Sequence, residues 1–226
     1  MLSVIIPALN EQLRVVESAQ EIIKAINSIG YKYEIIFVND GSTDSTYEKM
    51  LNFAEGNENI IIVNNGSNLG LGAAYKAGLS RASGDYITWV PSDLSHKEYS
   101  LIDTYKAIGQ EDMIIPIPKN PHVRSITRRA ISLTYTFIIN IISGNNIPYY
   151  NGLSVHKRDI LKKINIDTTG FGFQAEIIVK LLNKGASYKL VDTYIEERLD
   201  GGSKAFALKN FFEVVKTIKN IFLKKY

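Results

Sequence analysis

Continuous apolar runs alternate with amphipathic segments over the first 90 residues of the chain. The apolar runs cover residues 2–10, 33–40, 59–65 and 85–90, and each of them ends on polar residues or is followed by them. Uninterrupted apolar runs are typical of strands buried on both faces. The segments between them predict helices within 15–26, 41–51 and 70–82, because their apolar residues recur three and four positions apart or follow a cap or a glycine.

This order of elements predicts an α/β fold with a mostly parallel central sheet and helices on both faces. The second half is less regular. We expect a strand and loop at 113–121, a helix at 123–144, a strand leading into a helix at 151–161, a helix at 171–185, a strand pair or one extended strand at 187–199, and a glycine-rich turn before a terminal helix at 201–226.

Ligands of open α/β sheets bind beyond the carboxyl ends of the strands. Polar side chains gather at these ends, so we expect them to converge along one edge of the sheet. They are Asn10, Glu11, Asn39, Asp40, Ser42, Ser92 and Asp93.

Charge is spread unevenly along the chain. The net charge is +3, but residues 201–226 contain six lysines and one acid, Glu213, so the rest of the chain is close to neutral. The terminal segment also predicts an amphipathic helix, with Phe211, Val215 and Phe222 on one side and Lys209 and Lys216 largely opposite. We expect one domain, residues 1–204, followed by 205–226 as a basic helix that packs on the domain or contacts an anionic membrane surface. We favour the membrane surface.

Several partners and compartments are disfavoured. We find no RNA- or DNA-binding motif, and the absence of cysteine agrees with a reducing compartment. The longest apolar run, 131–142, is shorter than the roughly 20 residues that span a bilayer, although it could share the membrane contact. We therefore expect a cytoplasmic protein bound peripherally to the cytoplasmic face of a membrane.

Four stretches, VIIPALNE, VNDGSTDST, NLGLGAAYKAGL and VPSDLSH, occur in an order and spacing that resemble the GT-A fold of family 2 glycosyltransferases. The later NGLSVHKRDIL, FGFQAEII and ERLDGGSK resemble its polyprenol-phosphate (dolichyl-phosphate) mannosyl- and glucosyltransferase branch. The resemblance implies an inverting transfer of sugar from a GDP- or UDP-linked donor to a polyprenyl phosphate. Two alternatives stay open: transfer to a hydroxyl of a cell-surface glycan, and a non-catalytic subunit that binds nucleotide sugars.

The resemblance also implies a donor site. It assigns Asp40 and the loop of Pro7, Ala8, Asn10 and Glu11 to the base and ribose. It places Ser42, Ser92 and Asp93 beside the nucleotide sugar, and Arg198 and Lys204 on the donor phosphates, with backbone amides of 201–203 beside them. The competing interpretations are that Asp40 and Ser42 cap the next helix, and that 197–204 is an ordinary basic turn. We attribute Gly70 and Gly72 to helix–strand packing, while Asn68 and Lys76 remain minor candidates.

A metal site is expected with fewer carboxylate ligands than the family usually has. The family's Asp-x-Asp loop, with a polar residue two positions later, corresponds to Pro91, Asp93 and Ser95, so that only Asp93 keeps its carboxylate. Oxygen ligands suit Mg²⁺ or Mn²⁺, with the diphosphate and water completing the shell. Metal-independent transfer and a non-catalytic site are the alternatives. His96 could be recruited as a ligand, but a surface histidine at a helix start is the simpler account.

The acceptor site is expected on the predicted helix 123–144. If Arg124 is helical, then Arg124, Arg128 and Ser132 lie on one face, and the resemblance assigns Arg128 and Ser132 to the acceptor phosphate. A second family arginine is missing, and Lys119 is its nearest substitute. The alternative is a solvated basic face. Glu176 matches a family glutamate that would act as general base for a hydroxyl acceptor, or orient groups for a phosphate acceptor. The competing interpretation of Glu176 is an exposed helix carboxylate.

Overall fold

The computed structural model describes residues 1–196, and the expectations for 197–226, including Arg198, Lys204 and the terminal helix, lie outside these residues. The predicted alternation of the first half is confirmed. Its elements are β1 (Leu2–Ala8), α1 (Val15–Ser28), β2 (Tyr33–Asn39), α2 (Thr46–Ala54), β3 (Ile60–Asn64), α3 (Leu71–Leu79) and β4 (Tyr86–Trp89).

The second half contains α4 (Glu98–Lys106), of which only a helix start near His96 was expected. It also contains a single strand, rather than a strand pair, within the described part of 187–199. Its other elements are β5 (Met113–Pro118), a short 3-10 helix η1 (Pro121–Val123), α5 (Ile126–Ser143), β6 (Val155–Lys157), α6 (Arg158–Leu161), α7 (Phe173–Asn183) and β7 (Tyr188–Thr193).

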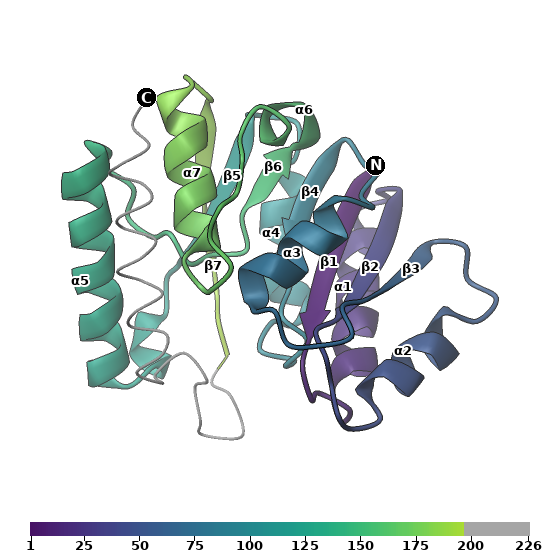
Figure 1. Ribbon diagram of the computed structural model, residues 1–226. Helices are drawn as coiled ribbons and strands as arrows, with labels where there is room; N and C mark the ends of the chain where they lie inside the picture. The colour runs from purple at the N-terminus through teal and green to yellow at the C-terminus, as the bar shows by residue number, and fades with distance from the viewer. Residues whose placement is uncertain (197–226) are drawn as a thin grey trace.

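One seven-stranded sheet organises the described chain, in the order β3-β2-β1-β4-β6-β5-β7 (Figure 1). The pairs β3–β2, β2–β1, β1–β4 and β5–β7 are parallel, whereas β6 runs antiparallel to both of its neighbours. The predicted mostly parallel sheet is therefore confirmed. The chain adds β2 and β3 on one side of β1 and then returns to add β4 on its other side. Because β1, β2 and β4 are parallel, their carboxyl ends lie at the same edge, where such sheets bind ligands.

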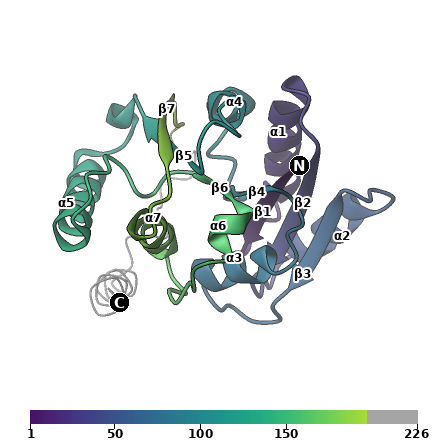
Figure 2. The same ribbon diagram turned by 90° about the horizontal axis from the view of Figure 1, so that it is seen from above.

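Helices cover both faces of the sheet. Seen from above, α1 and α4 lie on one face, while α3, α6 and α7 lie on the other (Figure 2). Every residue of β1 is buried, which explains why its sequence shows no polar alternation. On the second face Tyr75 of α3, Trp89 of β4 and Phe173 of α7 form an aromatic cluster. The ring centroids are 4.7 Å apart in the tilted pair Tyr75–Phe173 and 5.3 Å apart in the edge-on pair Trp89–Phe173.

Helix α5 lies at the β7 end of the molecule (Figures 1 and 2). It begins after Ser125, whose side chain accepts a hydrogen bond from the backbone N–H of Arg128, and it ends at Gly144 in the left-handed conformation. Arg124 is extended and precedes the helix. The expectation that Arg124 shares a helix face with Arg128 and Ser132 is therefore wrong, because the serine cap starts the helix two residues after Arg124.

Candidate active site

Hydrogen bonds tie together the carboxyl ends of three adjacent parallel strands. The backbone N–H of Asp40, after β2, donates to the carbonyl of Ala8 at 2.9 Å, and the hydroxyl of Ser92, after β4, donates to the carbonyl of Pro7 at 2.9 Å. The end of β1 thus contacts the loops on either side of it. Pro7, Ala8, Asp40 and Ser92 are brought together as the sequence predicted.

The loop after β1 is joined to the loop after β2. Asn10, in the left-handed conformation at φ 55°, donates its backbone N–H to the hydroxyl of Ser42 at 3.1 Å and accepts from the backbone N–H of Thr43 at 2.8 Å. The backbone N–H of Glu11 donates to the hydroxyl of Thr46 at 2.8 Å. Ser42 therefore fixes Asn10 and does not cap α2. Asp44 instead accepts from the backbone N–H of Thr46 at 3.0 Å.

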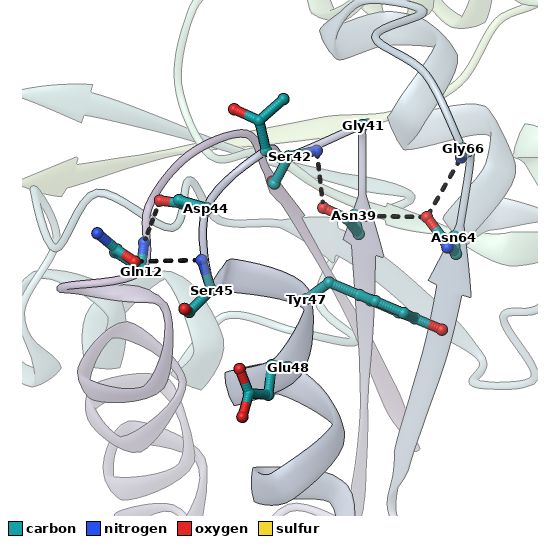
Figure 3. Close-up of a pocket in the computed structure, with 11 residues that line it drawn as sticks. Gln12, Asn39, Gly41, Ser42, Asp44, Ser45, Tyr47, Glu48, Asn64 and Gly66 are labelled. Carbon is teal, nitrogen blue, oxygen red and sulfur yellow. Dashed lines mark hydrogen bonds between the residues drawn. The ribbon is translucent and has the colours of Figure 1, made fainter.

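A polar cavity of about 730 Å³ opens at this joined pair of loops, at the ends of β2 and β3 (Figure 3). In its wall, the side chain of Asn39 donates to that of Asn64 at 2.9 Å, and the backbone N–H of Ser42 donates to the side-chain oxygen of Asn39. Several of its residues were not expected to contact a ligand, although Asn39 and Asn64 each end a strand. The lining residues are Gln12, Asn39, Gly41, Ser42, Thr43, Asp44, Ser45, Tyr47, Glu48, Asn64 and Gly66.

Asp40 does not line this cavity, and its buried carboxylate is turned toward residues 65–70. One oxygen accepts from the side chain of Asn65 at 2.8 Å and from the backbone N–H of Leu69 at 3.1 Å, and the other accepts from the N–H of Gly70 at 3.0 Å. Asp40 is thus not a cap of α2. It holds the turn that leads into α3.

The loop after β4 holds Asp93 in a buried position. One carboxylate oxygen of Asp93 accepts from the backbone N–H of Ser95 at 3.0 Å, and Leu94 between them is left-handed at φ 56°. The hydroxyl of Ser18 on α1 donates to the carbonyl of Pro91 at 3.1 Å. The loop is therefore anchored to both β1 and α1, and Asp93 lies in the loop beside the end of β1.

Residues 1–196 contain no cluster of three or more His, Cys, Asp or Glu side chains that could hold a metal ion without other ligands. Asp93 offers a carboxylate, and Mg²⁺ in substrate sites is commonly held by one or two carboxylates together with substrate phosphates and water. The single carboxylate of this loop fits such a cation only when a bound diphosphate supplies further oxygen ligands. His96 belongs to no described cluster with Asp93.

Basic side chains gather near the start of α5. A guanidinium nitrogen of Arg124 donates to the hydroxyl of Tyr149 at 2.9 Å, and its carbon lies 5.9 Å from the centroid of that ring. Burial and then the charge of Arg124 lower the pKa of Arg128, and the same two causes lower the pKa of His96 to about 4. His96, Arg124 and Tyr149 border one small cavity. His96 is thus partly buried, and the expectation of a surface histidine is wrong.

Two further predicted residues, Lys119 and Ser132, have their own settings. Lys119, the substitute for the missing arginine, forms an ion pair of 3.1 Å with Asp192. Ser132 is partly buried on α5, one turn after Arg128.

Glu176 differs most from its expected setting. It lies in the first turn of α7 and is fully buried, so the interpretation as an exposed helix carboxylate is wrong. Its oxygens accept from the backbone N–H groups of Asp167 at 2.9 Å and Thr168 at 2.8 Å, and from the ammonium of Lys180 at 2.5 Å. Burial lowers the pKa of Lys180, but its bonds to Glu176 and Asp167 outweigh burial and hold that pKa above the usual value.

Comparisons with known proteins agree with this geometry. Residues 3–165 match the model of the family "Glycosyl transferase family 2". A dolichyl-phosphate beta-glucosyltransferase of Trichomonas vaginalis is 33% identical over 115 residues, which are 49% of this chain and 34% of that protein. An undecaprenyl-phosphate 4-deoxy-4-formamido-L-arabinose transferase of Salmonella paratyphi B is 28% identical over 161 residues, which are 70% of this chain and 49% of that protein. The chain thus spans less than half the length of these two relatives.

Solved structures show the same fold. A glucosyl-3-phosphoglycerate synthase from Mycobacterium tuberculosis, in complex with Mn²⁺, UDP and phosphoglyceric acid, superposes with a TM-score of 0.71 at 15% sequence identity, covering 100% of this chain and 78% of that one. The chain has the GT-A fold and belongs to glycosyl transferase family 2.

Proposed function

We propose that the chain transfers a sugar from a nucleoside diphosphate sugar to a polyprenyl phosphate, with inversion at the anomeric carbon. The observation that carries the proposal is the order of three parts along the sheet. They are the polar cavity and loops at the ends of β1–β3, Asp93 at the end of β4, and the basic group of Arg124 and Arg128. Two relatives whose names give dolichyl phosphate or undecaprenyl phosphate support this acceptor class.

The donor would lie across the ends of β1, β2 and β4. Asn10, Ser42 and the cavity beside them offer hydroxyl and amide groups to a base and ribose, and they are pre-organised by their mutual hydrogen bonds. Asp93 would hold a divalent cation together with the diphosphate, and such a cation supplies neutralisation of the charge on the leaving group. The predicted phosphate contacts of Arg198 and Lys204 are part of the same proposal.

The acceptor phosphate would lie between Arg128, Arg124 and Ser132. A phosphate oxygen attacks the anomeric carbon, the bond from that carbon to the donor's diphosphate breaks, and nucleoside diphosphate leaves. A phosphate is already ionised near neutral pH, so no general base is needed. The three hydrogen bonds that Glu176 accepts in the core agree with this, since a base for a hydroxyl acceptor must reach the substrate.

Binding at a membrane surface follows from the acceptor and from the exposed side of α5. Leu133, Phe137 and Ile141 recur four positions apart on this helix and are each about two thirds exposed, at 69%, 65% and 65%. Residues 119–143 carry four Lys or Arg side chains and no acid. An apolar stripe beside basic groups suits the surface of an anionic leaflet, which we propose to be the cytoplasmic one. Within residues 1–196, no helix is long and apolar enough to cross a bilayer.

Calorimetric titration with UDP and with GDP, each with Mn²⁺ and with EDTA, tests the donor site. We expect one of the two nucleotides to bind, and to bind more weakly in EDTA and in the Asp93→Ala variant. Binding that is indifferent to EDTA would assign the phosphate contacts to basic residues alone. If neither nucleotide binds, the proposed transfer is wrong.

A further inference from the structure

Glu176 holds a segment of chain that lies outside its own helix. The segment is Asp167–Thr169, just before α7, and Glu176 accepts from the backbone N–H groups of its first two residues. Lys180, one turn further along α7, bonds to Glu176, to the carboxylate of Asp167 at 2.9 Å and to the carbonyl of Asn165 at 2.7 Å. The buried carboxylate is thus neutralised, and the segment is fixed to α7 at several points.

The same segment caps helix α3. The carbonyl of Thr169 accepts from the backbone N–H of Gly72 at 2.7 Å and from that of Ala73 at 3.2 Å, which are free donors in the first turn of a helix. A Cβ added to Gly70 would lie 2.7 Å from the carbonyl oxygen of Thr169, and a Cβ on Gly72 would lie 2.5 Å from that of Thr168. Both glycines are therefore required by this contact. Their neighbour is the 168–170 segment and not a strand, so the expectation of helix–strand packing at these glycines is wrong.

Asp40 binds the turn that leads into α3 from the other side. Asp40 accepts from the N–H groups of Leu69 and Gly70, and its own N–H donates to the carbonyl of Ala8. Gly41 packs against the backbone of Ser67 and Asn68 so closely that a Cβ would approach within 2.4 Å. A continuous set of contacts consequently runs from Glu176, through Thr168 and Thr169 and the 69–72 turn, to the strand ends of the donor site.

We propose that Glu176 is a positioning residue for the donor nucleotide and not the general base. It keeps the 167–169 segment packed on the first turn of α3, and this contact fixes the 69–72 turn that Asp40 binds, next to the strand ends where the nucleotide would lie. The inference rests on the proposed function only in naming a nucleotide as the ligand of these strand ends. It makes affinity for the donor, and not proton transfer, the property that Glu176 controls.

The test compares Glu176→Gln with the unchanged protein in nucleotide titrations and in steady-state kinetics. A glutamine loses at least one of the three hydrogen bonds, because one of its two acceptor positions becomes a donor. We expect the Kd for the nucleotide and the KM for the donor to rise roughly tenfold, with a much smaller change in the KM for the acceptor. The acidic limb of the pH–rate profile should keep its position. If Glu176 were the general base, that limb would move or vanish.

Two other variants approach the same contact from different sides. Gly72→Ala pushes on Thr168 from α3, and Lys180→Gln removes the ammonium while keeping a donor. Both should raise the nucleotide Kd, and Glu176→Gln combined with Gly72→Ala should raise it by less than the product of the separate effects. Glu111→Gln, an exposed acid in the turn before β5, is the matched control and should leave the Kd unchanged.

The outcomes separate the inference from the function on which it rests. If the unchanged protein binds neither UDP nor GDP, the proposed function fails. If it binds one of them and folded Glu176→Gln binds equally well, the positioning role is refuted. A fall in kcat with an unchanged donor KM and a lost acidic limb would restore the general base. Should Glu176→Gln fail to fold, an unchanged Kd in both Lys180→Gln and Gly72→Ala would equally overturn the inference.

Discussion

His156 is a titratable residue that the fold keeps uncharged. It lies in β6, opposite Ile87 of β4 and Met113 of β5, and it is fully buried. Neither ring nitrogen has a hydrogen-bond partner among residues 1–196, and burial lowers the pKa of His156 to about 3. The unfolded chain takes up a proton at this ring near pH 6.5, whereas the folded chain does so only far below that.

Stability should therefore fall on acidification. Between the unfolded and folded pKa values of His156 only the unfolded chain is protonated, so lowering the pH favours unfolding. From about pH 7.5 to about pH 5.5, this group lowers the free energy of unfolding by about 1 kcal/mol. Urea denaturation of the protein and of His156→Gln at both pH values measures the effect. An equal pH dependence in the two proteins would contradict it.

Arg128 gives the sharpest test of the acceptor at the level of one side chain. Arg128→Ala should reduce kcat/KM for a polyprenyl phosphate roughly 10- to 100-fold, as expected for the loss of a charged hydrogen bond to the phosphate. Lys163→Ala, which removes an exposed cation elsewhere, is the control. An Arg128→Ala enzyme with normal use of the lipid phosphate would rule out this acceptor site.

Single residues also show where sequence reasoning succeeded. Asp40, Asn10 and Ser42 were predictable as neighbours because each ends a strand or follows one, and parallel strands bring their ends together. The setting of Glu176 was not predictable, since its partners at Asp167 and Thr168 meet it only when the chain before α7 folds back. The start of α5 was predictable from the sequence, because Ser125 is a typical N-cap residue three positions before Arg128. A cap at Ser125 excludes Arg124 from the helix.

At the scale of elements, strands with uninterrupted apolar runs were predicted to within a few residues. β1 and β2 are buried almost throughout, so composition alone marks them. The extent of helix α4 was not predicted beyond a start near His96, because its nine residues, EYSLIDTYK, bury only Ser100, Leu101, Thr104 and Tyr105, two of which are small and polar. The antiparallel place of β6 depends on distant pairing, and no local pattern encodes it.

Helix α3 packs on the sheet through a glycine. A Cβ at Gly78 would lie 2.5 Å from a methyl carbon of Ile5 on β1 and 3.1 Å from one of Val38 on β2. Gly78→Ala should therefore destabilise the protein by about 1–3 kcal/mol, despite the better helix propensity of alanine. Thermal denaturation beside Arg81→Ala, an exposed change just after the helix, measures the difference. A raised melting temperature would show that the helix shifts to accommodate the methyl group.

At the scale of the whole molecule, α5 and the proposed donor site lie toward opposite ends of the sheet, and the loop of Asp93 follows β4 between them. This arrangement would let a membrane-bound acceptor meet a donor from solution. The predicted division into residues 1–204 and 205–226 stays a prediction, although one sheet organises the described chain.

Vesicle co-sedimentation tests the membrane surface. Leu133→Ser combined with Phe137→Ser should release the protein from vesicles that contain anionic phospholipid, because it removes apolar area from the exposed side of α5. Leu51→Ser, at an exposed leucine of α2, is the matched control. A chain that lacks 205–226 measures the contribution of the terminal segment separately. Unchanged sedimentation of the double variant would show that α5 does not face the membrane.

The short antiparallel strand β6 has a consequence for the order in which the sheet can fold during synthesis. β6 is three residues long, and it alone connects the β3–β2–β1–β4 group to β5 and β7 within the described sheet. The four strands of the first group are complete once residue 89 has left the ribosome, whereas their junction to the rest awaits residues 155–157. A nascent chain can therefore assemble the β3–β2–β1–β4 group as an early folding unit, with β4 exposed as an open sheet edge until β6 pairs with it.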